Sequence, residues 1–598
     1  MEGRLGRWLP AVLLIASCSR SGLEVSPAPR VEVDRSEDDG ARVRDSEPPD
    51  VGDSSVPGPP GPPVPPVPPV PVDLCEPSTC AGDRGVCEPD TGACACPDAC
   101  EPGIACTGGE LAQCRGDADG CLDWELEAIC DDGCFDGGRC TERDTLQWGT
   151  AGIDHGLGFG IDGGGGLYLT GHTARSFTGT PNAGPGDVFL TRLTADLSED
   201  WSRQWGSGMH EQGSALAVDP GDPGEPGEPG DPVNRPGAVY VAGRTFGALG
   251  GQASAGGGDG FVIRVGLDGM LAWTRHLGTP GRDEARDVAV DTPGDGDETA
   301  IYVVGTTEGD LGGQPNRGGQ CITGACPDGV MCTTRACTDA YVTRLRPDGS
   351  PAWTRVFGTV KNDAANAVTV APDGGVIVAG HSGGDLDGVR NLGGPCAPEP
   401  CNDLFVTRFE PDGGRAWTRV WGSDDNDVAA AVTTDDAGTV YVGAMTGGDL
   451  AGDNLGRGDA VLTQLSPQGT IGWSRQWGST EDEDLESVLV TAGGELVVVG
   501  QTHGNLDGRT DPPHHWDIFV TRFDADTGVP ESTQWGSAPD DGGFRPPSGA
   551  NAALQDADGN LLLFGYTLGD LDGNLNAGDD CQNLLGCADL FLATLAPR

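Results

Sequence analysis

Between residues 145 and 598 the chain repeats one short segment several times. One copy reads FVTRFEPDGGRAWTRVWG, and related copies are FLTRLTADLSEDWSRQWG, FVIRVGLDGMLAWTRHLG, YVTRLRPDGSPAWTRVFG and VLTQLSPQGTIGWSRQWG. Each copy holds two runs rich in Val, Phe, Thr and Trp on either side of a polar turn, usually with Asp and Gly, which is the pattern of a β-hairpin. Self-similarity at this spacing indicates stacked or radial repeats rather than one conventional core.

A terminal signal, usually an aromatic residue before glycine, marks seven units. Its glycines are Gly149, Gly206, Gly278, Gly358, Gly422, Gly478 and Gly536, separated by 56 to 80 residues. In the clearest unit four strand-like pieces follow in order: AVTV (367–370), VIVAG (376–380), LFVTRF (404–409) and AWTRVWG (416–422). Four antiparallel strands in each of seven units predict an all-β fold, a seven-bladed β-propeller.

The two ends of the array predict that the ring closes. The array begins with a lone fourth strand, TLQWGT (145–150), and ends with a lone third strand, LFLATLAP (590–597). Pairing of these two strands would complete the last blade and leave no exposed sheet edge. With the small residues of AVTV innermost, the loops after the second and fourth strands share one face, which we expect to carry the acidic loops and the cysteine insertions.

The unit DAYVTRLRPDGSPAWTRVFGTVKNDAANAVTVAPDGGVIVAGHSGGDLDG resembles the bacterial SBBP-type β-propeller repeat. The resemblance covers residues 145–598. It implies an exported or surface lipoprotein, from a family of largely uncharacterised role, and it supplies no catalytic motif to carry over.

Residues 1–17 have the pattern of a secretory signal, with two arginines ahead of the apolar run LPAVLLIAS. The run ends in IASC, which resembles the lipobox of bacterial lipoproteins and predicts acylation (palmitate among the acyl chains) at Cys18. Ser19 follows, and by the sorting habit of that family this implies the outer membrane, with the cell surface as one location. The alternative is an ordinary signal peptide with a chance cysteine. Membrane contact is expected through the N-terminal lipid only.

Two segments precede the propeller, which we expect to span residues 143–598. Residues 18–74 are acidic and proline-rich, and PGPPGPPVPPVPPVPV (57–72) predicts a polyproline rod roughly 50 Å long at about 3.1 Å per residue. Residues 75–142 hold 12 of the 21 cysteines, which predicts a disulfide-bonded module and disfavours the zinc alternative because no histidine falls within it.

The charge of the chain disfavours two kinds of partner. Acidic residues number 92 against 36 basic ones, for a formal net charge of −56. A chain this negative repels nucleic acid and anionic lipid and favours cationic partners or divalent ions, although the charge also simply keeps a protein dispersed. We expect a monomer.

Eight cysteines lie in loops of the predicted propeller. Local disulfides are predicted for Cys396–Cys401 and Cys581–Cys587. A third loop holds Cys321, Cys326, Cys332 and Cys337, which predicts two bridges of unspecified pairing. Such bridges would stiffen exposed loops on a binding face, or alternatively protect them from proteolysis.

Calcium is the one cofactor that the sequence suggests. The phrase GDLDG occurs at 384–388 and 569–573, and alternating carboxylates ahead of glycine are typical of oxygen-rich calcium loops. The candidate ligands are Asp385, Asp387, Asp570, Asp572 and Asn574. Asp and Gly are also ordinary turn formers, and the closing glutamate of an EF-hand is missing.

Evidence for catalysis is weak in the sequence. No G-x-S-x-G, H-E-x-x-H or phosphate-loop motif occurs, and the histidine pair of PPHHWD (512–517) fits a solvated loop better than a metal site. We therefore predict no catalytic residues and a non-enzymatic module that binds a protein or a glycan. The alternative is a polysaccharide-acting enzyme at the mouth of the central channel, which would gather His, Arg, Tyr and carboxylates there.

Overall fold

The computed structural model describes most of the chain from residue 143 onward, and only the backbone of seven short strands before it. The described ranges are 143–177, 179–221, 236–292, 298–323, 333–394, 401–506, 516–523, 530–536, 548–569, 571 and 588–597. Within them, no helix is long and apolar enough to span a membrane.

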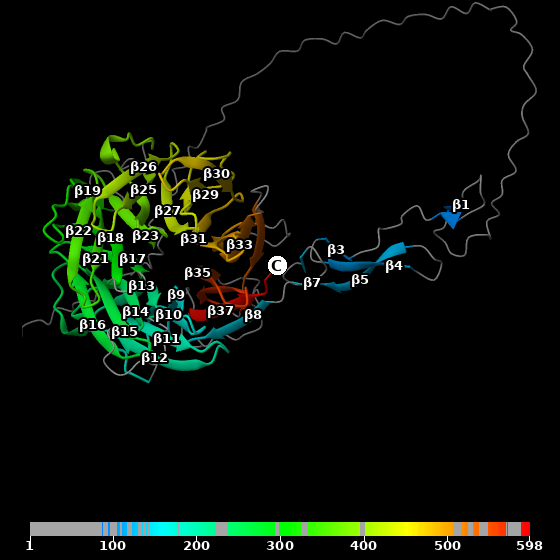
Figure 1. Cartoon of the computed structure of the whole chain (residues 1–598), viewed down its shortest axis with the longest axis horizontal. Helices are drawn as coiled ribbons and strands as arrows, with labels where there is room; N and C mark the ends of the chain where they lie inside the picture. The colour runs from blue at the N-terminus through cyan, green and yellow to red at the C-terminus, as the bar shows by residue number, and fades with distance from the viewer. Residues whose placement is uncertain are drawn as a thin grey trace, which may run out of the picture. The chain divides into compact units, whose positions relative to one another are not determined.

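Seven four-stranded antiparallel sheets stand around a common axis, and we number them as blades 1 to 7 (Figure 1). Blades 1 to 3 consist of β9 (Asp154–Ile161), β10 (Leu167–Thr173), β11 (Asp187–Leu193) and β12 (Glu199–Trp205); β13 (Glu211–Asp219), β14 (Ala238–Thr245), β15 (Asp259–Gly266) and β16 (Leu271–Leu277); and β17 (Asp283–Asp291), β18 (Ala300–Thr307), β21 (Asp339–Leu345) and β22 (Pro351–Phe357). The predicted seven-bladed propeller is thus confirmed.

The remaining blades follow the same order. Blades 4 to 6 consist of β23 (Asp363–Val370), β24 (Val376–Ser382), β25 (Asp403–Phe409) and β26 (Arg415–Trp421); β27 (Asp427–Thr434), β28 (Val440–Thr446), β29 (Asp459–Leu465) and β30 (Ile471–Trp477); and β31 (Glu483–Val490), β32 (Leu496–Thr502), β33 (Asp517–Phe523) and β34 (Pro530–Trp535). Blade 7 consists of β35 (Ser548–Gln555), β36 (Leu561–Thr567), β37 (Asp589–Leu595) and β8 (Arg143–Trp148). Two 3-10 turns, η1 (Leu249–Gly251) and η2 (Leu386–Gly388), follow the second strands of blades 2 and 4.

Ring closure occurs as the sequence predicts. Strand β8 pairs antiparallel with β37, placing Trp148 opposite Leu590 and Gln147 opposite Phe591 (Figure 1). The next junction is tied as well, because the Asp154 amide donates to the Ala588 carbonyl at 2.8 Å. The ring therefore has no unpaired blade edge at its seam.

The innermost strands are longer than the sequence pattern indicates. The predicted AVTV piece is only the second half of β23, which starts at Asp363, and the acidic loop read at 422–431 contains the start of β27 at Asp427. An aspartate normally suggests a turn. Here its carboxylate accepts bonds from the preceding loop, as Asp363 does from the Thr359 amide and hydroxyl, so it begins a strand instead.

Outer-edge tryptophans and arginines link blades 1 to 5 in succession. In four successive junctions a fourth-strand Trp donates its Nε1 to a carbonyl in the following blade's hairpin turn, at 2.9 to 3.2 Å: Trp201 to Leu267, Trp273 to Pro347, Trp353 to Pro411 and Trp417 to Pro467. In three of them the Arg two residues later donates to the turn's glycine: Arg203, Arg355 and Arg419. This explains why W-T/S-R recurs in the repeat.

The recurring glycine after the aromatic residue also has a structural reason. A Cβ on Gly358 would lie 2.5 Å from Asp339 Oδ1 and 2.8 Å from Asp363 Oδ2, and a Cβ on Gly422 would meet Asp403 and Asp427 in the same way. Both carboxylates of each pair are buried, one from the third strand of a blade and one from the first strand of the next. Glycine is required because its missing side chain makes room for the pair.

The chain divides into a larger unit that contains the propeller and a smaller one that contains the first five strands. The short strands pair as β1 (Val86–Cys87) with β2 (Cys94–Ala95), β3 (Ile104–Thr107) with β4 (Glu110–Gly116) and β5 (Leu122–Ile129), and β6 (Cys134–Phe135) with β7 (Arg139–Cys140).

Candidate functional site

Every innermost strand carries a β-bulge at the same place. The register shifts leave one extra residue in each first strand: Leu157, Ser214, Arg286, Asn366, Ala430, Glu486 and Asn551. Neighbouring first strands contact one another around the whole ring, so the bulges form a layer around its axis. A bulge re-aims a side chain, and bulges recur next to binding sites. These positions repeat while their residue types do not.

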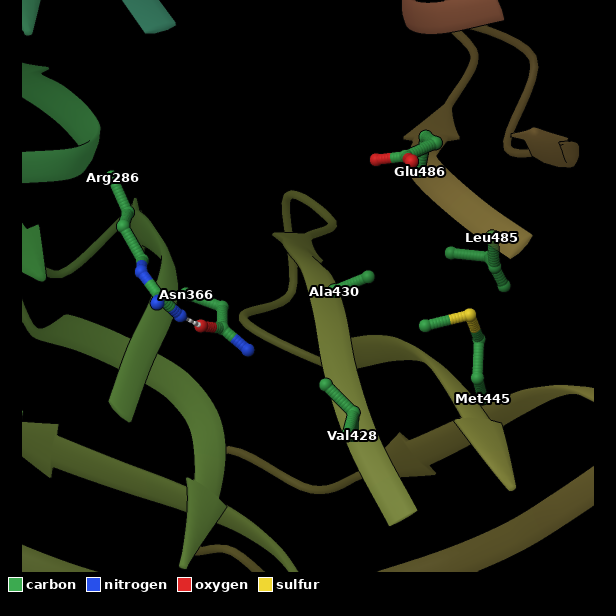
Figure 2. A pocket seen from close by; sticks show the side chains of 7 residues that line it. All are labelled: Arg286, Asn366, Val428, Ala430, Met445, Leu485 and Glu486. Carbon is green, nitrogen blue, oxygen red and sulfur yellow. Dashed lines mark hydrogen bonds between the residues drawn. The ribbon is translucent and has the colours of Figure 1, made fainter. Parts of the chain in front are cut away.

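Four consecutive bulge residues line a pocket in the centre of the ring (Figure 2). Arg286 and Asn366 form one side, and Glu486 lies on the other with its carboxylate pointing into the open space. The apolar side chains between them are Val428, Ala430, Met445 and Leu485. The pocket thus separates a guanidinium and an amide from a carboxylate by an apolar surface.

Hydrogen bonds fix the polar side of the pocket. Arg286 donates from Nη1 to Asn366 Oδ1 at 2.5 Å and from Nε to Glu284 at 3.3 Å. Asn366 in turn donates to the Ala429 carbonyl of the next blade at 2.7 Å. The guanidinium is therefore held in place, with about a quarter of its side chain (25%) exposed.

The walls of the channel carry opposite charge. Burial opposes ionisation of Glu284, yet the guanidinium groups of Arg286 and Arg244 outweigh it and lower the pKa of this carboxyl. On the opposite wall, burial together with the negative charges of Glu486 and Asp484 raises the pKa of Tyr566 to about 12. The arginines of blades 2 and 3 thus make one wall positive. The carboxylates of blade 6, next to Tyr566 of blade 7, make the opposite wall negative.

Three histidines gather on blades 1 and 2. The ring centroids of His155 and His172 lie 4.9 Å apart, those of His172 and His210 lie 5.2 Å apart, and His155 stacks on Tyr566 at 4.5 Å. Burial, with the nearby His210, lowers the pKa of His155 to about 4, and burial also lowers the pKa of the other two histidines. All three are therefore neutral at pH 7.

The loops after the second and fourth strands lie on one face, as predicted. At six junctions the first residue of an innermost strand donates its amide to the carbonyl just before the previous blade's third strand, at 2.8 to 2.9 Å. The donor–acceptor pairs are Glu211–Gly186, Asp283–Gly258, Asp363–Thr338, Asp427–Asn402, Glu483–Gly458 and Asp154–Ala588. These bonds hold the two kinds of loop side by side.

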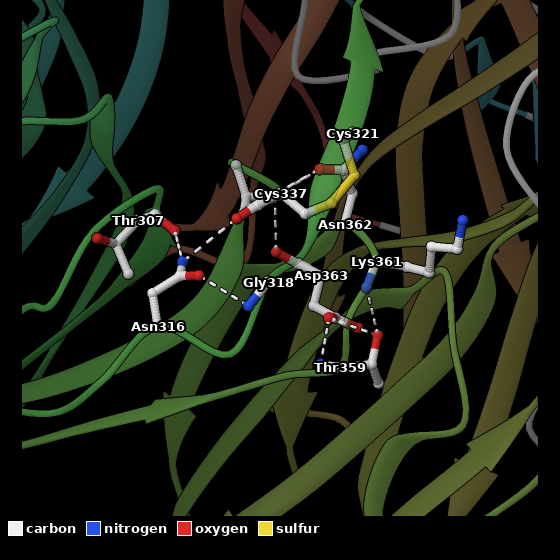
Figure 3. The surroundings of a disulfide bond; sticks show 10 residues. Thr307, Asn316, Gly318, Cys321, Cys337, Thr359, Lys361, Asn362 and Asp363 are labelled. Atoms are coloured by element: carbon white, nitrogen blue, oxygen red, sulfur yellow. Dashed lines mark hydrogen bonds between the residues drawn. A yellow bond between two sulfur atoms is a disulfide. The ribbon is translucent and has the colours of Figure 1, made fainter. Parts of the chain in front are cut away.

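One loop of this face is built out into a second sheet (Figure 3). Strands β19 (Gln320–Thr323) and β20 (Thr333–Ala336) form a hairpin, and the Cys321–Cys337 disulfide joins its base. The Gly319 amide donates to the Val360 carbonyl of the neighbouring loop at 3.0 Å, and Asn316 Nδ2 donates to the Thr307 carbonyl at 2.7 Å (Figure 3). The base of the excursion is thus fixed to the ring.

The predicted cysteine sites are only partly described. Of the four cysteines in the third loop, the structure pairs Cys321 with Cys337, while Cys326 and Cys332 lie outside the described residues. Cys401 is disulfide-bonded, and its predicted partner Cys396 lies outside them. Cys18, Cys581 and Cys587 also lie outside the described residues.

Two candidate calcium ligands are described. Asp385 accepts a bond from the Asn391 amide at 3.0 Å, and Asp387 lies in η2 and accepts bonds from Arg415 and Thr418. Asp570, Asp572 and Asn574 lie outside the described residues. Across the part of the chain that is described, no group of three or more His, Cys, Asp or Glu side chains could hold a metal ion.

No family model matches the chain. Over 214 residues, 34% of its length, it is 27% identical to the Regulatory protein FlaEY of Caulobacter vibrioides, and it spans only 21% of that relative. The chain also matches the solved structures of a puromycin hydrolase (15% identity, 70% of this chain and 59% of that one, TM-score 0.30) and an apocarotenoid oxygenase of Synechocystis (12% identity, 76% and 93%, TM-score 0.33). Identities and scores this low carry no argument about function.

Proposed function

We propose that this chain is an exported lipoprotein, anchored to the outer membrane through Cys18, whose propeller binds a protein or a glycan without catalysing a reaction. The observation that supports the proposal is the face of the ring that carries the loops after the second and fourth strands, which we call the loop face. Backbone hydrogen bonds at the blade junctions hold these loops side by side, and a disulfide fixes the β19–β20 hairpin there. Loops held by a rigid scaffold are the usual place for recognition. The SBBP resemblance of residues 145–598 supports a surface lipoprotein.

Binding is tested with the full chain on immobilised probes. The panel holds amine-bearing, neutral and acidic polysaccharides, and purified cationic and anionic extracellular proteins. The net charge of −56 favours amine-bearing glycans and cationic proteins, with retention that falls as salt rises. The Cys321→Ser/Cys337→Ser variant loosens the added hairpin and should weaken retention, whereas Gly208→Ala, whose Cβ meets nothing within 4 Å, should not. Retention of no probe would contradict the proposal.

The anchor is tested by acyl incorporation. Cells that express the chain are fed labelled palmitate, and we expect label on the wild type, none on Cys18→Ala, and only the wild type in the outer-membrane fraction. Label on Cys18→Ala, or an unlabelled wild type, would contradict the anchor and leave the ordinary signal peptide.

We also propose calcium binding at the GDLDG turn of residues 569–573, with Asp570, Asp572 and Asn574 as ligands. Thermal unfolding with added Ca²⁺ and then with a chelator measures it. We expect an increase in Tm with the metal that the chelator removes, and a smaller increase in Asp572→Asn. An unchanged Tm in both conditions would contradict calcium binding.

A second candidate is a polysaccharide-acting enzyme at the channel mouth. The observation that favours it is the cluster of neutral His155, His172 and His210 beside Tyr566, with Arg244 of blade 2 nearby. Release of reducing ends from the same polysaccharides, lost in His172→Ala, would support the enzyme. Absence of turnover with every polysaccharide that binds would leave the binding module.

A further inference from the structure

The central pocket has the composition of a site for a small ligand with two charges. Its polar side offers the guanidinium of Arg286, which matches the planar geometry of a carboxylate. Asn366 holds this guanidinium through Oδ1, and its Nδ2 already donates to the Ala429 carbonyl and to His381 Nδ1. The other side of the pocket offers the carboxylate of Glu486, which suits an ammonium group. The two sides belong to blades 3 and 4 and to blade 6, so blade 5 lies between them (Figure 2).

The surface between the charges is apolar. Val428, Ala430 and Met445 of blade 5, with Leu485 of blade 6, line the pocket between its two polar sides. A ligand whose charges share one carbon, such as a free α-amino acid, would leave this surface in contact with water. A ligand whose two charges are separated by a short apolar spacer covers this apolar surface and reaches both Arg286 and Glu486.

The surroundings reinforce this polarity. Arg244 pairs with Glu284 at 3.4 Å and adds positive charge behind Arg286. Asp484 lies two residues before Glu486 on β31 and accepts a bond from Gln501 at 3.3 Å, adding negative charge on the other wall. A charge-separated channel orients a dipolar ligand and disfavours ligands with a single charge, which meet an opposing wall.

The bulges explain how one repeat builds such a site. The bulge position is occupied by Arg, Asn, Ala and Glu in blades 3 to 6, although a valine follows two residues later in each of these strands. Identical blades would surround the axis with seven equal side chains and no polarity. From this arrangement we propose that the central channel binds a dipolar ligand, a short peptide or an ω-amino acid, with its carboxylate on Arg286 and its ammonium on Glu486.

The test uses calorimetric titration of the full chain with 6-aminohexanoate, hexanoate and hexylamine. We expect 6-aminohexanoate to bind at least about tenfold more tightly than either singly charged compound, because each of these lacks one of the two charge-assisted contacts. Trialanine and its N-acetyl form distinguish the two sources: a peptide site prefers trialanine to 6-aminohexanoate and loses about tenfold on acetylation.

Variants assign the two ends. Arg286→Met should weaken 6-aminohexanoate about tenfold and leave hexylamine unchanged, and Glu486→Gln should weaken it about tenfold and leave hexanoate unchanged. Arg346→Met and Asp348→Asn, in an exposed hairpin turn, are the matched controls and should bind as the wild type does. Arg286→Lys keeps the charge if Arg286→Met does not fold, and circular dichroism checks each variant.

Equal affinity for all three compounds, an unchanged affinity in both channel variants, or no binding of any probe would overturn the proposal. Loss of affinity in the turn controls would also overturn it. Retention on the polysaccharide and protein panel should be unaffected by the channel variants, so failure here is distinguishable from failure of the loop-face proposal.

Discussion

The outer and inner edges of the ring use the same repeat in opposite ways. At the outer edge the same residue types, Trp and Arg, make the same bonds to the next blade's turn in successive junctions. At the inner edge the same backbone bulge recurs with a different residue in most blades. Invariance at the rim maintains the ring, and variation at the axis makes its centre chemically uneven.

The difference shows where function should be sought in a repeat protein. Residues that recur in every unit satisfy a need that every unit has, namely attachment to its neighbour. A backbone position that repeats with different side chains is not required for attachment to the neighbouring blade, so its side chains can bind a ligand. Substitutions at the rim should therefore lower stability more than substitutions at the bulges.

The largest effect is expected at the outer edge. Trp353 packs near Tyr302 and Phe409, with centroid distances of 6.1 and 6.5 Å, and donates to the Pro411 carbonyl at 3.0 Å. Trp353→Ala should lower the free energy of unfolding by about 3 kcal/mol, measured by chemical denaturation. Trp353→Phe keeps most of the packing and should lose about 1 kcal/mol. A loss of less than about 1 kcal/mol in Trp353→Ala would show that the outer edge does not hold the blades together.

The junction glycine should have the next largest effect. Gly358→Ala places a methyl group 2.5 Å from Asp339 Oδ1, against two buried carboxylates that cannot both move aside. We expect a loss of about 2 kcal/mol by the same measurement. Gly208→Ala is the control, since its Cβ meets nothing within 4 Å. Similar losses for the two variants would contradict the proposed role of this glycine.

The carboxylate pair also predicts a pH dependence. Burial, with the charge of Asp339 adding to it, raises the pKa of Asp363 to about 7 from 3.8. Because the folded pKa is the higher one, this group stabilises the fold fully below about pH 4 and loses that contribution as pH rises through about 7. The stability of the wild type relative to Asp363→Asn should thus fall between pH 5 and pH 8, by at most about 1.4 kcal/mol per pH unit.

This comparison isolates the buried pair of Asp339 and Asp363. The buried histidines have lowered pKa values, so they make the fold less stable as the pH falls, which is the opposite trend. Both proteins contain them, so their contribution cancels in the difference. Asp348→Asn is the control, because the carboxyl of Asp348 is exposed and ionised over the whole range, so its difference from the wild type should not change with pH. A flat difference for Asp363→Asn would contradict the raised pKa.

Much of the fold could be predicted from the sequence because the repeat is local and regular. The number of blades, their strand order and the closing pair at Trp148 and Leu590 all follow from counting hairpins and finding one lone strand at each end. The start of the innermost strands could not be predicted. In six of the seven blades their first residue is acidic, and at Asp427 the bonds from the Ser423 amide and hydroxyl explain its place in a strand.

Little of the candidate site could be predicted from the sequence. A bulge depends on how two strands pair, and AANAV and AAAV give no sign that Asn366 or Ala430 is the extra residue. His155 and His172 are 17 positions apart in the sequence, yet they face each other across β9 and β10. A signal that could have found the site is the comparison of equivalent positions between aligned repeats, where the bulge residues vary most.

The smallest effect is expected at the bulges themselves. Asn551 of blade 7 donates from Nδ2 to the Gly156 carbonyl of blade 1 at 2.6 Å, as Asn366 does to the Ala429 carbonyl. Asn551→Ala removes this bond and should cost about 1 kcal/mol or less, because blade 5 already folds with Ala430 at the same position. Chemical denaturation beside Trp353→Ala tests the comparison directly: a larger loss for Asn551→Ala would mean that the axis, and not the rim, holds the ring together.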